Sequence, residues 1–130
     1  MEIRTKKTKS GNTYKFVNES WSNSNGWGHK TTIIRNSYDY EPHKVRYYNR
    51  TWESYTFQTC MSGAVNELRE KELQRFIDNY KYSNNIDRFK KGQKQEVEKL
   101  FEETEIAQDL KELKEAIRDR KFSTYEELYK

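Results

Sequence analysis

The sequence predicts an α+β fold: an N-terminal four-stranded antiparallel sheet packed by one long helix, followed by a C-terminal helical subdomain. Residues 1–50 contain short alternating or β-branched stretches separated by turn residues, which is typical of strands. From residue 52 onward, apolar residues recur at the i, i+3, i+4 spacing of amphipathic helices. We therefore expect a β-sheet plus helix domain over residues 1–82 and a helical subdomain over residues 83–130.

The strands are expected in four stretches joined by short connections, which favours an antiparallel meander. The stretch at 31–34 is β-branched throughout, and 43–49 alternates Val45 and Tyr47 with charged residues. Residues 22–28 are predicted to form a polar loop, because Gly and Asn tolerate positive φ there. Pro42 is expected to end the connection after the third strand. The predicted strands are residues 2–8, 14–20, 31–34 and 43–49.

A long helix is predicted over residues 52–80, with Thr51 as its N-cap. Its first apolar stripe covers one face and contains Phe57, Cys60, Met61, Ala64, Val65 and Leu68. A second stripe from Leu73 to Tyr80 is rotated around the helix axis. Either the helix breaks at 69–72 or it presents successive faces to the sheet and to the C-terminal helices, and we favour the second arrangement. Within the first stripe, Cys60 is expected to be a buried structural thiol.

The C-terminal half is expected to be helical, with a break and a new N-cap at Thr104. The residues Ile106, Leu110, Leu113 and Ile117 form one apolar stripe. We expect this stripe to dock within the chain on residues 73–80, although it also has the spacing of a two-heptad dimer seam. Residues 123–126 form a capping box, which predicts a terminal helix over 124–129.

Composition limits the class of protein. Apolar residues make up 32% of the chain, against the usual share of about 45–50%, while aromatics reach 15%. The chain shows no apolar run of membrane-spanning length and no signal-peptide stretch near Met1. A single cysteine fits a reducing compartment. We therefore expect a thinly packed cytoplasmic protein without a membrane partner, present as a monomer or weak dimer.

The positive charge lies mainly in the aromatic-rich first half. Residues 1–66 contain ten Lys/Arg against five Asp/Glu, and residues 67–130 contain fifteen against sixteen. Lys15, Lys44 and Arg46 are expected to share the solvent face of the sheet with Tyr48. That mixture of cations and a stacking surface suits RNA, DNA or an acidic protein surface. The same pattern also occurs on ordinary exposed sheet faces.

Few residues suggest catalysis. The usual zinc spacings and glycine-rich phosphate loops are absent, and a magnesium site from Glu19, Asp39 and Glu41 has only weak support. A metal-independent ribonuclease needs an acid and a base, for which His29 and His43 are available, with Arg50 or Arg35 to stabilise charge. Two ordinary histidines are a weak signal, so we predict no enzyme, no catalytic residue, no metal and no cofactor.

Large aromatics mark the expected binding surface. Trp27 lies in the polar stretch, where an exposed ring suggests contact with a partner. Trp52 and Tyr55 project away from the first helix stripe, so they either cap the second stripe or flank Arg50 as an anchor cluster. The predicted partner- or nucleic-acid-binding residues are Lys15, Trp27, Lys44, Arg46, Tyr48, Arg50, Trp52 and Tyr55.

The run YNRTWESYTFQ at residues 48–58 resembles a signature of small phage and plasmid accessory proteins of low-GC Gram-positive bacteria. The resemblance covers roughly residues 10–68 and leaves the helical tail outside. It supplies no catalytic residues. What it implies is a cytoplasmic mobile-element protein that blocks a host defence nuclease, such as a type II CRISPR effector.

Three functional hypotheses follow. The first is a non-enzymatic, anti-CRISPR-like inhibitor that binds a host defence nuclease or its nucleoprotein complex. The second is a stand-alone nucleic-acid-binding protein that uses the basic, aromatic sheet face. The third is a small metal-independent ribonuclease. Salt separates the first two, because phosphate contacts weaken steeply with ionic strength.

Overall fold

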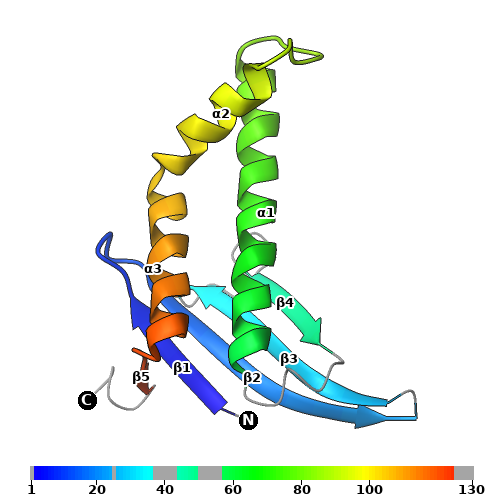
Figure 1. The fold of residues 1–130 in the computed structure, drawn as a ribbon, viewed down its shortest axis with the longest axis vertical. Helices are drawn as coiled ribbons and strands as arrows, with labels where there is room; N and C mark the ends of the chain where they lie inside the picture. Colours follow the sequence, from blue (N-terminus) through cyan, green and yellow to red (C-terminus); the bar gives the residue numbers. More distant parts are fainter. Residues whose placement is uncertain (1, 25, 37–43, 50–56, 125–130) are drawn as a thin grey trace.

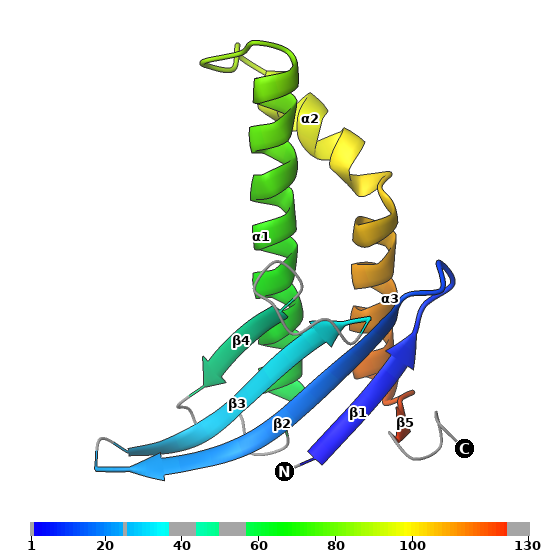
Figure 2. The same cartoon turned by 180° about the vertical axis from the view of Figure 1, so that it is seen from behind.

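The computed structural model describes residues 2–24, 26–36, 44–49 and 57–124 of the 130-residue chain. It confirms the α+β class: an antiparallel sheet precedes three helices, and the long helix α1 packs on that sheet (Figure 1). The elements are β1 (Glu2–Lys7), β2 (Thr13–Asn23), β3 (Gly26–Arg35), β4 (Lys44–Asn49), α1 (Gln58–Ser83), α2 (Gln93–Glu102), α3 (Glu105–Asp119) and β5 (Ser123–Thr124). Seen from behind, the sheet lies in front of α1 and α3, so both helices cover the same face (Figure 2).

The sheet has the strand order β4-β3-β2-β1-β5, with every neighbouring pair antiparallel. Strands β1 to β3 form the central meander, with β4 and β5 at the two edges. The predicted helix over 124–129 is wrong at its start, because Ser123 and Thr124 pair with Thr5 and Arg4 of β1. The unpaired edge of β1 outweighs the capping signal at this position. Residues 125–130 lie outside the described residues.

The predicted polar loop over residues 22–28 is also wrong. Strand β2 continues to Asn23 and β3 begins at Gly26, with Trp21 opposite Gly28 and Ser22 opposite Trp27. Ladder hydrogen bonds come from the backbone, so a polar stretch can pair as well as an apolar one. A two-residue connection is enough to reverse an antiparallel pair. The hairpin is therefore much longer than its composition indicated.

The core lies between the sheet and the helix pair α1–α3. The first stripe of α1 is buried as predicted, and Cys60 is a buried thiol. The predicted helix start at residue 52 is wrong, because Phe57 precedes α1 with a left-handed φ of 45°. A residue with that backbone cannot continue an α-helix, and the apolar stripe itself begins only at Phe57. Thr51, the predicted cap, lies outside the described residues.

The C-terminal stripe docks within the chain, but not where we expected. Leu110, Leu113 and Ile117 join the core cluster formed by the sheet and the first stripe of α1. The expected position, on the second stripe of α1, is taken by α2, whose Phe101 ring lies 5.7 Å from that of Phe76. Burial of the stripe inside one chain leaves it unavailable as a dimer seam.

Helix α1 runs unbroken to Ser83, which confirms that it presents successive faces to the sheet and to a C-terminal helix. Arg69 pairs with Glu102 and lies 5.5 Å from the centre of the Phe101 ring, which fastens α2 to α1. The predicted domain division after residue 82 stays a prediction. Within the described ranges, no helix combines the length and apolarity needed to cross a membrane.

The helix ends use local hydrogen bonds. Thr104 caps α3 as predicted, with its Oγ1 accepting from the Ala107 N–H at 3.3 Å. The turn after α3 reverses through Arg120, whose φ is 56°, while the Lys121 N–H donates to Ala116 O at 2.9 Å. Such a left-handed position is usually glycine, because a Cβ costs about 1 kcal/mol there.

We predict that Arg120→Gly raises the free energy of unfolding by about 0.5–1 kcal/mol, since it removes this backbone strain. The matched control is Arg118→Gly inside the last turn of α3, where glycine is expected to lower stability by about 1 kcal/mol. Urea unfolding of the two variants checks this. Loss of stability in both variants contradicts the strain at Arg120.

Candidate functional site

Lys15 lies on the face of the sheet that points away from the helices. Its neighbours Tyr14 and Phe16 are fully buried in the helix-side core, and successive side chains of a strand point to opposite faces. Lys15 itself is half-buried. It pairs with Ile34 of β3, which in turn pairs with Lys44 of β4.

The register brings most of the predicted cations into one phase of the strand alternation. Arg46 pairs with Thr32 and Tyr48 pairs with Lys30, two positions in step with Ile34. Lys30 of β3 lies in the same phase and forms a 3.2 Å ion pair with Glu19, its partner in β2. The four predicted positions that share this phase, here called the cationic row, are Lys15, Lys44, Arg46 and Tyr48. Only for Lys15 is the side chain described.

The other predicted binding residues are not brought to this row by the described part of the chain. Trp27 lies in β3 opposite Ser22, in the long hairpin, and its side chain is not described. Arg50, Trp52 and Tyr55 lie outside the described residues. The anchor cluster around Arg50 therefore stays a prediction.

The residues considered for catalysis have structural contacts. His29 Nδ1 lies 3.1 Å from Ser20 Oγ, and its ring meets the Phe57 ring edge-on at 4.8 Å. It thereby packs beside the start of α1. His43 lies outside the described residues, so the predicted acid–base pair stays a hypothesis.

Among the described residues, the carboxylate and thiol candidates have structural roles. Glu19 is engaged by Lys30, and among described residues no group of three or more His, Cys, Asp or Glu could hold a metal. Asp39 and Glu41 lie outside the described part. Burial raises the pKa of the Cys60 thiol, only partly offset by hydrogen bonding with Thr31. A buried thiol with a raised pKa is a poor nucleophile, which agrees with its expected structural role.

Sequence reasoning missed a buried carboxylate cluster in the contact between α3 and the β1–β2 turn. Asp109 is fully buried, and its oxygens accept hydrogen bonds from three side chains of residues 10–14. The distances are 2.8 Å from Ser10 Oγ, 2.9 Å from Asn12 Nδ2 and 2.8 Å from the Tyr14 hydroxyl. A signal for this site existed, because Asp109 interrupts the apolar face three residues after Ile106.

The electrostatics of this cluster identify a structural role. Burial alone would raise the pKa of the Asp109 carboxyl, but hydrogen bonds from Asn12, Thr8, Ser10 and Tyr14 outweigh it and lower that pKa. Burial, followed by the hydrogen bond to Asp109, raises the pKa of Tyr14 well above its ordinary value. At neutral pH the Asp109 carboxyl is therefore ionised and the Tyr14 hydroxyl is protonated. Asp109 is a fixed anion that ties α3 to the sheet.

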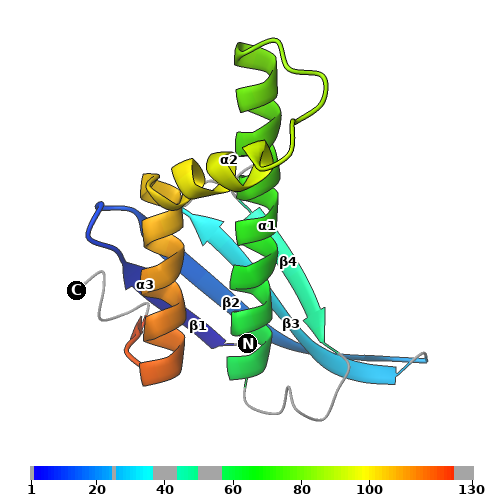
Figure 3. The same ribbon diagram turned by 45° about the horizontal axis from the view of Figure 1, so that its top comes forward.

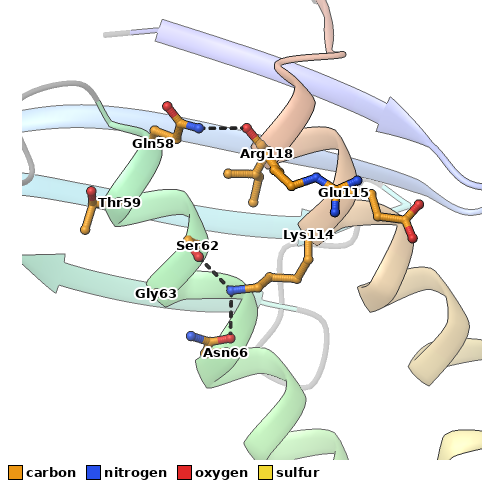
Figure 4. Close-up of a pocket in the computed structure, with 9 residues that line it drawn as sticks. Gln58, Thr59, Ser62, Gly63, Asn66, Lys114, Glu115 and Arg118 are labelled. Carbon is orange, nitrogen blue, oxygen red and sulfur yellow. Dashed lines mark hydrogen bonds between the residues drawn. The ribbon is translucent and has the colours of Figure 1, made fainter.

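A polar groove of about 730 Å³ separates α1 from α3 (Figure 4). Lys114 of α3 extends across it and donates to Ser62 Oγ at 2.6 Å and to Asn66 Oδ1 at 3.1 Å. At one end, Gln58 Nε2 donates to Ile117 O at 3.0 Å. Gly63 of α1 also lines the groove. These contacts use the polar groups of the groove to hold the helices together.

No protein-family model, curated protein or solved structure matches this chain.

We predict that Asp109→Asn lowers the free energy of unfolding by about 2–3 kcal/mol at pH 7, because buried donors lose a charged acceptor. The folded-state pKa of Asp109 is lowered, so its contribution is present above the unfolded pKa of about 3.9 and is lost as pH falls through the folded value. The difference in the free energy of unfolding between the wild type and the variant should therefore become smaller below about pH 4.

The matched control for this measurement is Glu112→Gln on the same helix. Glu112 accepts an exposed hydrogen bond from the Lys9 N–H at 3.1 Å, so its substitution should cost less than about 1 kcal/mol. Chemical denaturation at several pH values compares both variants with the wild type. A pH-independent difference for Asp109→Asn contradicts the ionised, buried carboxylate.

Proposed function

We propose that this chain is a non-enzymatic inhibitor of a host defence nuclease, carried by a phage or another mobile element. It acts by binding the nuclease or its nucleoprotein complex. The origin in a mobile element comes from the resemblance of residues 48–58, and the mode of action from the residues of the sheet.

The observation that supports this proposal best is the cationic row. Lys15 of β2 shares one phase of the strand alternation with Lys44, Arg46 and Tyr48 of β4. The Lys15 side chain lies on the face of the sheet away from the helices. Acidic protein surfaces and phosphates are the groups that such a row attracts. Arg and Tyr are also the residue types that carry the most energy in protein interfaces.

The chemistry of the described polar residues supports binding rather than turnover. Asp109 is an anion enclosed by its own hydrogen bonds, and Cys60 is a buried thiol with a raised pKa. Reactive groups of enzymes are instead accessible and titrate near neutral pH. The ribonuclease alternative is tested by His29→Ala, which would abolish RNA cleavage by a folded protein if that alternative held.

The direct experiment is recovery of the tagged protein from a bacterial host lysate, with and without nuclease treatment, followed by identification of retained proteins. Retention of a defence nuclease in both arms supports the proposal, especially if the purified nuclease is inhibited. Recovery of nucleic acid alone, lost after treatment, overturns it and favours a stand-alone nucleic-acid-binding protein.

We predict that Lys15→Glu combined with Arg46→Glu lowers the affinity for the retained nuclease at least about tenfold, because like charges then face its acidic groups. The control is Lys71→Glu combined with Lys121→Glu, which makes the same change of net charge at two exposed positions away from the row. Titration of the purified components measures both affinities. An equal loss of affinity in the two variants contradicts the assignment of the binding site to the cationic row.

A further inference from the structure

The distal end of α1 projects away from the sheet and carries the loop that connects it to α2 (Figure 3). We call residues 80–94 the tip. It comprises the last turn of α1, the connection and the first two residues of α2. The sheet lies at the other end of the molecule (Figure 1). The groove between α1 and α3 is lined by residues of the first turns of α1 and the last turns of α3. The tip is thus a separate surface.

The tip concentrates positive charge. It contains five Lys or Arg residues and a single acidic residue, a net charge of +4, which equals that of the whole chain. Residues 95–119, which follow in α2 and α3, contain nine Asp or Glu against four Lys or Arg. The net charge of the C-terminal half is therefore near zero because a basic tip and an acidic pair of helices, α2 and α3, offset each other. The charged residues of the tip are Lys81, Asp87, Arg88, Lys90, Lys91 and Lys94.

These cations are available to a partner. Among the described residues, four exposed tip cations form no salt bridge; they are Arg88, Lys90, Lys91 and Lys94. Tyr82, in the last turn of α1, is 88% exposed. An aromatic ring this exposed contributes nothing to the core of the fold, so its apolar surface is free for contact.

The backbone of the tip is fixed by local contacts. The Ile86 N–H donates to Lys81 O at 2.8 Å and the Asn85 N–H to Tyr82 O at 3.4 Å, with Asn85 at a φ of 51°. This is the Schellman pattern of a helix end. The Lys81 ammonium lies 4.7 Å from the centre of the Phe89 ring, which folds the connection back on α1. A loop held in this way loses little entropy when it binds.

A second cap fixes the start of α2. The Lys90 N–H donates to Gln93 Oε1 at 3.0 Å, and the Gln93 N–H donates back to Lys90 O at 3.0 Å. Lys90 and Lys91 therefore stand at a defined place on the tip. Their ammonium groups remain exposed.

Exposed cations and an exposed ring on the same tip match the chemistry of single-stranded nucleic acid. Phosphates pair with Lys and Arg, and an unpaired base stacks on an aromatic face without a sequence requirement. An acidic protein surface also contacts Arg and Tyr, but a single strand supplies both a charge partner and a flat stacking partner in each nucleotide. A duplex keeps its bases stacked internally, so it would use the cations alone.

We propose that the α1–α2 tip is a binding site for single-stranded nucleic acid, in which Arg88, Lys90 and Lys91 contact phosphates and Tyr82 stacks on a base. This site goes beyond the proposed inhibition and does not depend on it, because it lies on another surface and takes another class of ligand.

The test measures anisotropy of fluorescent oligothymidylate and oligouridylate with the full-length protein, between about 50 and 200 mM salt. The wild type should bind, with affinity that falls as salt rises. The triple variant Arg88→Glu/Lys90→Glu/Lys91→Glu should bind at least about tenfold more weakly, and its salt slope should be shallower by about 2. Tyr82→Ala should weaken binding about fivefold or more with an unchanged slope.

The matched control is Lys71→Glu/Lys99→Glu/Lys121→Glu, which makes the same change of net charge at three exposed positions outside the tip. It should bind much more tightly than the tip variant. Thermal unfolding checks that all variants fold. Absence of wild-type binding at the lowest salt overturns the proposal, as does equal weakening by tip and control variants. A duplex bound as tightly as the single strand, or Tyr82→Ala bound like wild type, overturns the stacking role.

Failure of this test is distinguishable from failure of the proposed inhibition. The oligonucleotide assay contains no host protein, whereas inhibitor binding is measured as nuclease-resistant retention of one. A negative result for the tip therefore does not contradict binding of a nuclease by the cationic row.

Discussion

The buried carboxylate of Asp109 is the constraint on which the arrangement of the sheet and the C-terminal helix depends. It lies in α3, ninety-five residues after Tyr14, and accepts hydrogen bonds from the β1–β2 turn and from β2 itself. A buried anion is tolerated only when its lone pairs are filled, so α3 has one favourable position and register against the hairpin. That position brings Leu110, Leu113 and Ile117 over the sheet and completes the core.

The same arrangement separates two basic surfaces. The cationic row belongs to the sheet, where Lys15 points away from the helices, and the tip lies at the far end of α1. Between them, α2 and α3 are rich in Asp and Glu, some of which pair within the chain, as Glu102 does with Arg69 and Lys111. Positive charge is therefore concentrated in the sheet and at the tip, and not in α2 and α3. This polarity is not visible in the net charge alone.

Where the chain has strong local patterns, much of the fold could be predicted from them. The stripe from Phe57 to Leu68, the cap at Thr104 and the alternation in β2 specify element type and buried face. The long β2–β3 hairpin and β5 could not be predicted, because their pairing depends on the backbone and on an available strand edge. The cationic row follows from alternation plus register. The Asp109 cluster could not be predicted without the tertiary fold, because its donors lie about 95 residues earlier in the chain. The position of Asp109 within an apolar stripe nevertheless indicated that its carboxylate is buried.

The most direct test of the Asp109 constraint is a double-mutant cycle between Tyr14→Phe and Asp109→Ala, read as free energies of unfolding. The two residues share a 2.8 Å hydrogen bond inside the core. We expect an interaction energy of about 1–2 kcal/mol, since each single variant already removes the shared bond. Additive effects, within about 0.5 kcal/mol, would show that the Tyr14–Asp109 bond does not couple α3 to the sheet and would contradict the account.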